Sequence, residues 1–216
     1  MRSTRQLPVL LLAGLLLLAI PAGAKSPAPS SGVPAQPEAA SSRQNKAGWA
    51  SKKFAVAAAH PLAVEAGYQI LKAGGSAVDA AVAVQMVLAL VEPQSSGIGG
   101  GAFMLHHDGR ITEAYDGRET APSEADEDLF LDAQRQPLSF QAAAVGGRAV
   151  GTPGVLHMLA LAHQQHGRLP WRQIFQPAIT LAEEGFPVGP RLHALLAEAD
   201  SLRQDPDAAA YFFDSQ

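Results

Sequence analysis

Hydrophobic and polar positions follow regular periods from about Phe54 onward. The apolar run Phe54–Ala59 predicts a buried strand, which His60-Pro61 interrupts. Apolar residues then recur every three or four positions over residues 62–73, which predicts an amphipathic helix with Pro61 in its first turn. Gly74-Gly75 suits a left-handed turn that ends this helix.

A second helix is predicted directly afterwards. Ser76 and Asp79 have the spacing of a capping box, with aspartate in place of the usual glutamate. The following "AVDAAVAVQMVLALVEP" is apolar on nearly every side, so we expect a helix that is buried on most sides and ends before Pro93.

The stretch "QSSGIGGGAF", Gln94–Phe103, contains a G-x-G-x-x-G/A pattern that is also found in dinucleotide sites. Such sites have a strand before the glycines and a helix after them. Here a helix precedes the glycines and the alternating "AFMLHHDGRITEAYDGRE" follows them. We therefore interpret the glycines as a sharp exit from the helix that lets another backbone or a ligand approach closely.

The alternating segment predicts a hairpin, with His107-Asp108-Gly109-Arg110 as a type I′ turn. Arg118 follows the second strand, in a turn made by Asp116-Gly117. A guanidinium there can grip a carboxylate with two parallel hydrogen bonds, or it can pair at the surface with Asp116 or Glu119. Both roles stay open on spacing alone.

Residues 123–140 are polar and irregular, and helical patterns resume from Thr152. We expect Thr152 to cap a helix that Pro153 starts and Gly167 ends. Two short helices joined at Pro177 and closed by Gly185 come next. A single amphipathic helix is predicted over "GPRLHALLAEADSLRQDP", so the element order indicates an α+β fold.

The N-terminus has the pattern of an export signal. A basic leader, an apolar run over residues 7–20 and the small-x-small sequence Ala22-Gly23-Ala24 predict a signal peptide over residues 1–24, cleaved near Ala24. Residues 25–48, rich in Pro, Ser and Ala, are expected to be a flexible linker. We expect residues 49–216 to form the folded part of the chain. We also expect the protein, once its signal peptide is cleaved, to be periplasmic or secreted.

Composition excludes several classes of function. The chain of 216 residues has a formal net charge of −4, which offers no electrostatic footprint for nucleic acid. It contains no cysteine, so neither a disulfide framework nor a cysteine nucleophile is available. His163 and His166 share a helix face, but no third ligand lies at metal-site spacing in the sequence, and we expect no metal site.

Five ordered blocks carry a resemblance to a known family. "GGSAVDAAVAVQ", "EPQSSGIGGGAF", "DGRETAP", "VGTPGVLHML" and "PAITLAEEGFPV" resemble the N-terminal part of the large subunit of gamma-glutamyltransferases, also called glutathione hydrolases. The resemblance covers about residues 52–214. It implies an αββα sandwich of the N-terminal-nucleophile hydrolase type, incomplete in this chain, and no cofactor.

The resemblance also implies a site. Arg118 stands where the family arginine binds the α-carboxylate of the γ-glutamyl group. The precursor of such an enzyme cuts itself before a threonine, which then attacks the γ-amide of glutathione and passes the glutamyl group to water, an amino acid or a peptide. A small subunit from the same precursor completes the heterodimer, and its glycines form the oxyanion hole.

One departure from the family pattern limits what this chain can do alone. In this family the nucleophilic threonine is the first residue of a T-T-H-type segment. No threonine among residues 1–216 begins such a segment. We therefore expect the nucleophile beyond Gln216, no catalytic residue within the chain, and an inactive fragment. Two alternatives remain: a related amidase of the cephalosporin acylase kind, or a non-catalytic remnant that binds glutamate through Arg118.

Overall fold

The computed structural model describes Gly48 and residues 50–214. The predicted signal peptide, and all of the predicted linker except Gly48, lie outside the described residues. The described elements follow in the order α1 (Pro61–Lys72), α2 (Ala77–Val91), β1 (Ala102–His107), β2 (Thr112–Gly117), α3 (Phe140–Ala144), a 3-10 turn (Gly147–Ala149), α4 (Val155–His166), α5 (Trp171–Ile174), α6 (Gln176–Glu184), α7 (Pro190–Ala197), α8 (Asp200–Gln204) and α9 (Pro206–Phe212).

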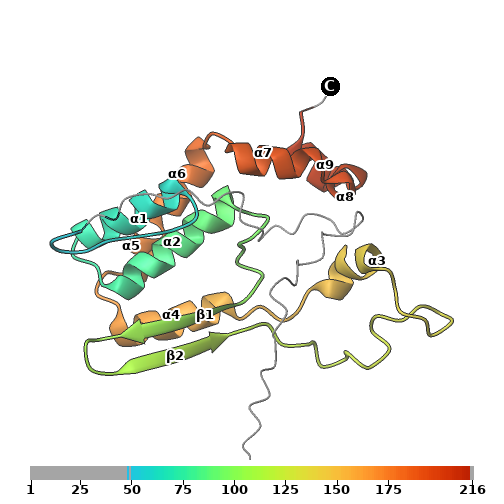
Figure 1. The fold of residues 1–216 in the computed structure, drawn as a ribbon, viewed down its shortest axis with the longest axis horizontal. Coiled ribbons are helices and arrows are strands. Elements are labelled where there is room, and N and C mark those ends of the chain that lie inside the picture. Colours follow the sequence, from blue (N-terminus) through green and yellow to red (C-terminus); the bar gives the residue numbers. More distant parts are fainter. Residues whose placement is uncertain (1–47, 49, 215–216) are drawn as a thin grey trace, which may run out of the picture. The chain divides into compact units, whose positions relative to one another are not determined.

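Helices α1 and α2 lie side by side in Figure 1, and their residues contact each other. The predicted end signals are confirmed. Gly74 has a φ of +93°, and the Ser76 side chain accepts from the backbone of Asp79 while the Asp79 carboxylate accepts from the backbone of Ser76. Helix α2 ends at Val91, two residues before Pro93.

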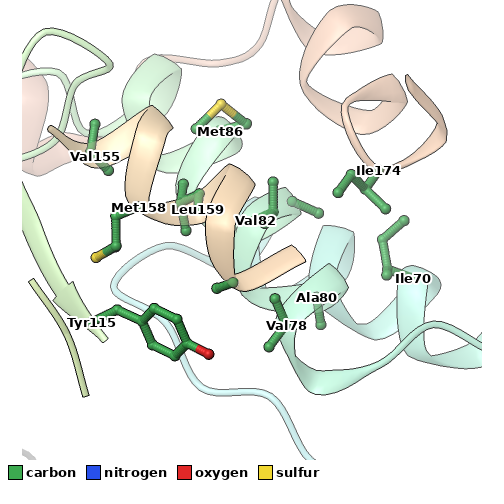
Figure 2. Packing of buried hydrophobic residues seen from close by; sticks show 12 residues of the cluster. Ile70, Val78, Ala80, Val82, Met86, Tyr115, Val155, Met158, Leu159 and Ile174 are labelled. Atoms are coloured by element: carbon green, nitrogen blue, oxygen red, sulfur yellow. The ribbon is translucent and has the colours of Figure 1, made fainter. Parts of the chain in front are cut away.

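The core forms where α2 meets α4 and the hairpin. Val82 on α2, Val155 on α4 and Ile174 on α5 are at most 1 % exposed, and Tyr115 reaches the same cluster from β2 (Figure 2). Burying a side chain of this size contributes about 1.5–3 kcal/mol. The apolar side of α2 therefore fixes the positions of α4 and of the hairpin that carries Arg118.

Strands β1 and β2 form an antiparallel pair in which Ala102 lies opposite Gly117 and His107 opposite Thr112. The predicted type I′ turn is wrong, because it requires two central residues with positive φ and only Gly109 has one, at +97°. Instead the Asp108 carboxylate accepts from the backbone nitrogens of Arg110 and Ile111, which closes the turn from one side.

Three other expectations about elements are wrong. Phe54–Ala59 alternates between half-buried and exposed positions and pairs with no strand in the described part of the chain. Thr152 does not cap a helix, because its backbone pairs with Thr120 and α4 begins only at Val155. The single helix expected after Gly189 is divided into α7 and α8, with Glu198 and Ala199 between them.

The two short helices around Pro177 and the end at Gly185 are confirmed. Among the residues that the structure describes, no helix combines the length and the apolar character needed to cross a bilayer.

Candidate functional site: an exposed arginine beside a glycine-lined turn

Arg118 is the first residue after β2, and its backbone is held in place. Its nitrogen donates to Asp116 Oδ1 at 2.9 Å. The turn expected at Asp116-Gly117 is wrong, because both residues belong to β2 and pair with Phe103 and Ala102. Its guanidinium Nη1 lies 3.2 Å from Glu119 Oε2, and the Arg118 side chain is 68 % exposed. The arginine is therefore anchored through its backbone and one carboxylate while most of its donor fork faces solvent.

Glu119 holds the arginine from the protein side. Only 27 % of its side chain is exposed. Oε2 is buried and, among the described residues, has no hydrogen-bond partner beyond the ion pair with Arg118. A half-buried carboxylate with one contact of this kind restricts where the guanidinium lies without covering its remaining donors.

The glycine stretch packs directly against this arginine–glutamate pair. A Cβ atom on Gly101 would lie 2.5 Å from Glu119 Oε2, 2.7 Å from the Gly117 carbonyl oxygen and 2.9 Å from Arg118 Cα. Gly99, by contrast, has nothing within 4 Å of its Cβ position. The prediction that a glycine here permits close approach of another backbone is thus confirmed at Gly101.

Two further segments close the same region. The Gly100 carbonyl oxygen accepts from the backbone nitrogens of Gly154 and Val155, each at 3.2 Å, where α4 begins. Thr120 and Thr152 exchange two backbone hydrogen bonds, of 3.3 Å and 2.8 Å. The glycine stretch, the segment after β2 and the start of α4 are therefore joined around Arg118.

A pocket of about 290 Å³ opens at this junction. Arg118 and Glu119 line one part of it, and Leu129, Phe130 and Arg148 line another. Sequence reasoning missed Arg148, because an arginine in "GGRAVG" carries no chemical signal until the fold brings it to the pocket. Its Nη1 donates to the Leu129 carbonyl oxygen, which ties the irregular segment to the pocket wall.

The composition of the pocket suits an anion. Two arginines, Arg118 and Arg148, are among its lining residues, and most of the Arg118 side chain is exposed. A carboxylate is the group whose planar pair of oxygens matches the guanidinium fork.

The structure also brings together three potential metal ligands that the sequence analysis did not connect. His106 on β1 lies opposite Glu113 on β2, and His166 from the end of α4 reaches both. Their ligand atoms lie within 4.8 Å of one another. The hairpin register, once fixed, would have paired the first two, whereas the contribution of α4 depends on packing.

His163, which the sequence places on the same helix face as His166, has a structural role instead. Its Nε2 lies 2.9 Å from the Leu169 carbonyl oxygen and 3.4 Å from Asp79 Oδ1. It therefore belongs to the loop after α4 and not to a ligand cluster.

Comparison with known proteins identifies the family. The sequence model described as Gamma-glutamyltranspeptidase matches residues 63–216. The Glutathione hydrolase proenzyme of Bacillus subtilis (strain 168) is 46% identical over 152 residues, which is 69% of this chain and 25% of that protein. The chain thus spans about a quarter of the length of the curated relatives that it matches.

The comparison with solved structures points to the same family. The Helicobacter pylori gamma-glutamyltranspeptidase superposes with a TM-score of 0.73 at 34% identity, covering 77% of this chain and 48% of that chain. A cephalosporin acylase from Bacillus halodurans gives a TM-score of 0.61 at 32% identity, covering 75% of this chain and 31% of that chain.

The mixed helices and small sheet described above are therefore part of a domain shared with N-terminal-nucleophile hydrolases. The chain belongs to the gamma-glutamyltranspeptidase family.

Proposed function

We propose that this chain supplies the substrate-binding arginine of an exported gamma-glutamyltransferase or glutathione hydrolase. The observation that carries the proposal is the Arg118 guanidinium, 68 % exposed at a pocket and held by Glu119 in a chain of this family. Its role is to bind the α-carboxylate of a γ-linked glutamate. Glutathione and other γ-glutamyl compounds are the proposed donors.

Binding at the α-carboxylate leaves the other end of the glutamyl side chain to react. The γ-carbonyl is three carbon atoms away from the α-carbon, so a guanidinium that fixes the carboxylate also limits where the scissile amide lies. Positioning of this kind converts binding energy into rate, because the reacting groups start near their reactive geometry. Glu119 is proposed to act as a positioning residue, because its carboxylate is paired with the Arg118 guanidinium.

The nucleophile is proposed to come from a threonine outside these 216 residues, in a small subunit released from the same precursor. Two observations support this. The sequence has no T-T-H-type segment, and the Bacillus subtilis relative is named a proenzyme. Attack by the threonine breaks the γ-amide bond, releases its amine and leaves an acyl-enzyme, which passes the glutamyl group to water or to an amino acid or peptide. The 216 residues alone are then inactive.

The exposed face of the hairpin supports the proposal of an αββα sandwich. Phe103 and Leu105 on β1 are 69 % and 77 % exposed, although both are large apolar residues. Their neighbours in the strand point toward α4, as the alternation of exposed and half-buried residues requires. A second sheet packed on this face would remove both side chains from water.

Export is proposed from the leader sequence alone, since residues 1–24 carry the pattern of a signal peptide. Detection of a mature N-terminus near Lys25 in the secreted or periplasmic fraction would support it, and recovery of the intact leader in the cytosol would oppose it.

A second candidate is an amidase that acts on a different acyl group, because a cephalosporin acylase is among the similar solved structures. The test compares γ-glutamyl anilide with glutaryl anilide, using the complete gene product. The two substrates differ by the α-amino group alone. Faster cleavage of the γ-glutamyl compound is expected. Preference for the glutaryl compound would favour the acylase, and cleavage of neither would contradict both.

A further inference from the structure

Three side chains of types that can bind a metal ion, His106, Glu113 and His166, lie together at the end of the hairpin away from Arg118. His106 and Glu113 are directly opposite each other in the β1–β2 register. Glu113 Oε2 lies 3.6 Å from His106 Nδ1 and 3.0 Å from His166 Nε2. Glu113 and Arg118 are five residues apart on β2 and its extension, which places them roughly 17 Å apart along the strand at about 3.4 Å per residue.

One ring nitrogen of His106, Nδ1, is buried without a hydrogen-bond partner among the described residues. A buried nitrogen of this kind is costly to leave unsatisfied, by about 1–3 kcal/mol. Since Glu113 Oε2 is too far for a hydrogen bond and His166 Nε2 is close to the same oxygen, an ion placed between the three would satisfy the nitrogen.

The surroundings of the two rings show what must change when an ion binds. His106 and His166 stack with their centroids 3.9 Å apart and an interplanar angle of 24°, so their in-plane nitrogen lone pairs do not yet converge. One ring must rotate about its side-chain bonds for both nitrogens to face the same ion. The Tyr115 hydroxyl lies 2.8 Å from His166 Nε2 and also bonds Gln165 Oε1.

The donor set selects the kind of ion. Two imidazoles and one carboxylate suit Zn²⁺ and similar divalent transition metals, whereas Mg²⁺ and Ca²⁺ prefer oxygen ligands throughout. Metal–ligand distances of about 2.0–2.2 Å place neighbouring ligand atoms of a tetrahedral site roughly 3.4 Å apart. The observed 3.0 Å and 3.6 Å lie on either side of that value.

Access to the cluster is also suitable. The side chains of His106 and His166 are 16% and 21% exposed, while that of Glu113 is 44% exposed. An ion can therefore enter from the Glu113 side, and water can occupy a fourth position there.

We propose that His106, Glu113 and His166 form a binding site for Zn²⁺ or a similar divalent transition metal ion. On binding, His166 Nε2 exchanges its contact with the Tyr115 hydroxyl for the metal. The ion joins β1, β2 and the C-terminal end of α4, so it stabilises the attachment of the hairpin to that helix. This proposal does not depend on the γ-glutamyl chemistry proposed above.

The test is a titration of the complete gene product, purified without a polyhistidine tag and freed of metal, with Zn²⁺ alone. One equivalent is expected to bind in a saturable manner. Co²⁺ in its place is expected to give the visible absorption of a four-coordinate ion with nitrogen and oxygen ligands. Zn²⁺ should also raise the melting temperature, because a ligand that binds only the folded state stabilises it.

Variants test whether the cluster of His106, Glu113 and His166 is what binds Zn²⁺. His106→Ala and the nearly isosteric Glu113→Gln should each weaken binding by about 100-fold or more, since removing even an outer-shell partner costs roughly 10–100-fold. His157→Ala removes an exposed histidine of the same helix α4 and should leave the affinity unchanged. Circular dichroism of each variant verifies that it is folded.

The inference is overturned if the protein binds no Zn²⁺ at submillimolar concentrations, or if Glu113→Gln and His106→Ala bind it as tightly as the parent protein. Equal weakening by His157→Ala would also overturn it, since binding would then be spread over surface histidines.

Discussion

The carboxylate of Asp79 accepts a hydrogen bond from the backbone nitrogen of Leu169 at 3.0 Å, across 90 residues of sequence. The same carboxylate accepts from the backbone nitrogens of Ser76 and Arg168 and lies near His163. Asp79 is fully buried. One side chain thus starts helix α2 and anchors the loop that follows α4.

Replacing Asp79 is therefore expected to destabilise the fold. Asp79→Asn keeps the size of the side chain but removes the charge that several N–H groups share, and hydrogen bonds to charged groups contribute about 1.5–3 kcal/mol each. We predict a loss of roughly 3 kcal/mol in the free energy of unfolding, measured by chemical denaturation. Glu124→Gln, an exposed position, should change it by less than about 0.5 kcal/mol. Equal stability of both variants would show that the Asp79 network is unimportant.

The two glycines Gly101 and Gly99 give a matched pair for the packing behind Arg118. Gly101→Ala would place a methyl group against Glu119 and the backbone of Gly117 and Arg118, whereas Gly99→Ala would meet nothing within 4 Å. Overpacking of this kind costs about 1–3 kcal/mol. We expect Gly101→Ala to lower the melting temperature and raise the KM for a γ-glutamyl anilide in the complete protein.

Gly99→Ala serves as the control and should affect neither quantity strongly. If the two alanine variants behave alike, the glycine stretch does not set the position of the arginine–glutamate pair.

The hairpin turn is predicted to respond to acid. Backbone hydrogen bonds, first from Ile111 and then from Arg110, lower the pKa of Asp108 below its ordinary value of 3.8. The folded state therefore binds the Asp108 proton less readily than the unfolded state does. Its contribution to stability is present above about pH 4 and is lost as the pH falls through the lowered pKa.

The measurement for this turn compares the pH dependence of unfolding in the parent protein and in Asp108→Ala. The parent should lose more stability than the variant between pH 4 and pH 2. Parallel curves would mean that the turn carboxylate is not stabilised by these backbone groups.

Much of the helical scaffold could be predicted from local chemistry. The capping box at Ser76 and Asp79, the glycines at Gly74 and Gly185, and the stop before Pro93 are signals within a few residues of the helix ends they determine. The position of Arg118 directly after a strand was predictable for the same reason, because strand alternation is local, although Asp116 and Gly117 belong to the strand and not to a turn.

The sequence-based predictions were wrong or incomplete where pairing between distant segments determines the backbone conformation. Thr152 has the composition of a helix cap, but its pairing with Thr120 keeps it outside α4. The bond from Leu169 to Asp79 and the approach of His166 to the hairpin depend on how α4 packs. Arg148 reaches the pocket for a similar reason, since a long irregular segment separates it from Arg118.

The central claim is that Arg118 binds the α-carboxylate of a γ-linked glutamate. It is tested most directly by steady-state kinetics of the complete gene product with γ-glutamyl anilide and with 4-aminobutyryl anilide, which lacks the α-carboxylate. Arg118→Ala should lower kcat/KM for the γ-glutamyl substrate by roughly 10–100-fold or more, the equivalent of losing a charge-assisted contact of about 1.5–3 kcal/mol. The same variant should leave the slower cleavage of the 4-aminobutyryl substrate nearly unchanged, and Arg172→Ala, an exposed arginine on α5, should affect neither. Undiminished cleavage of γ-glutamyl anilide by Arg118→Ala, or an equal loss with both substrates, would contradict the account.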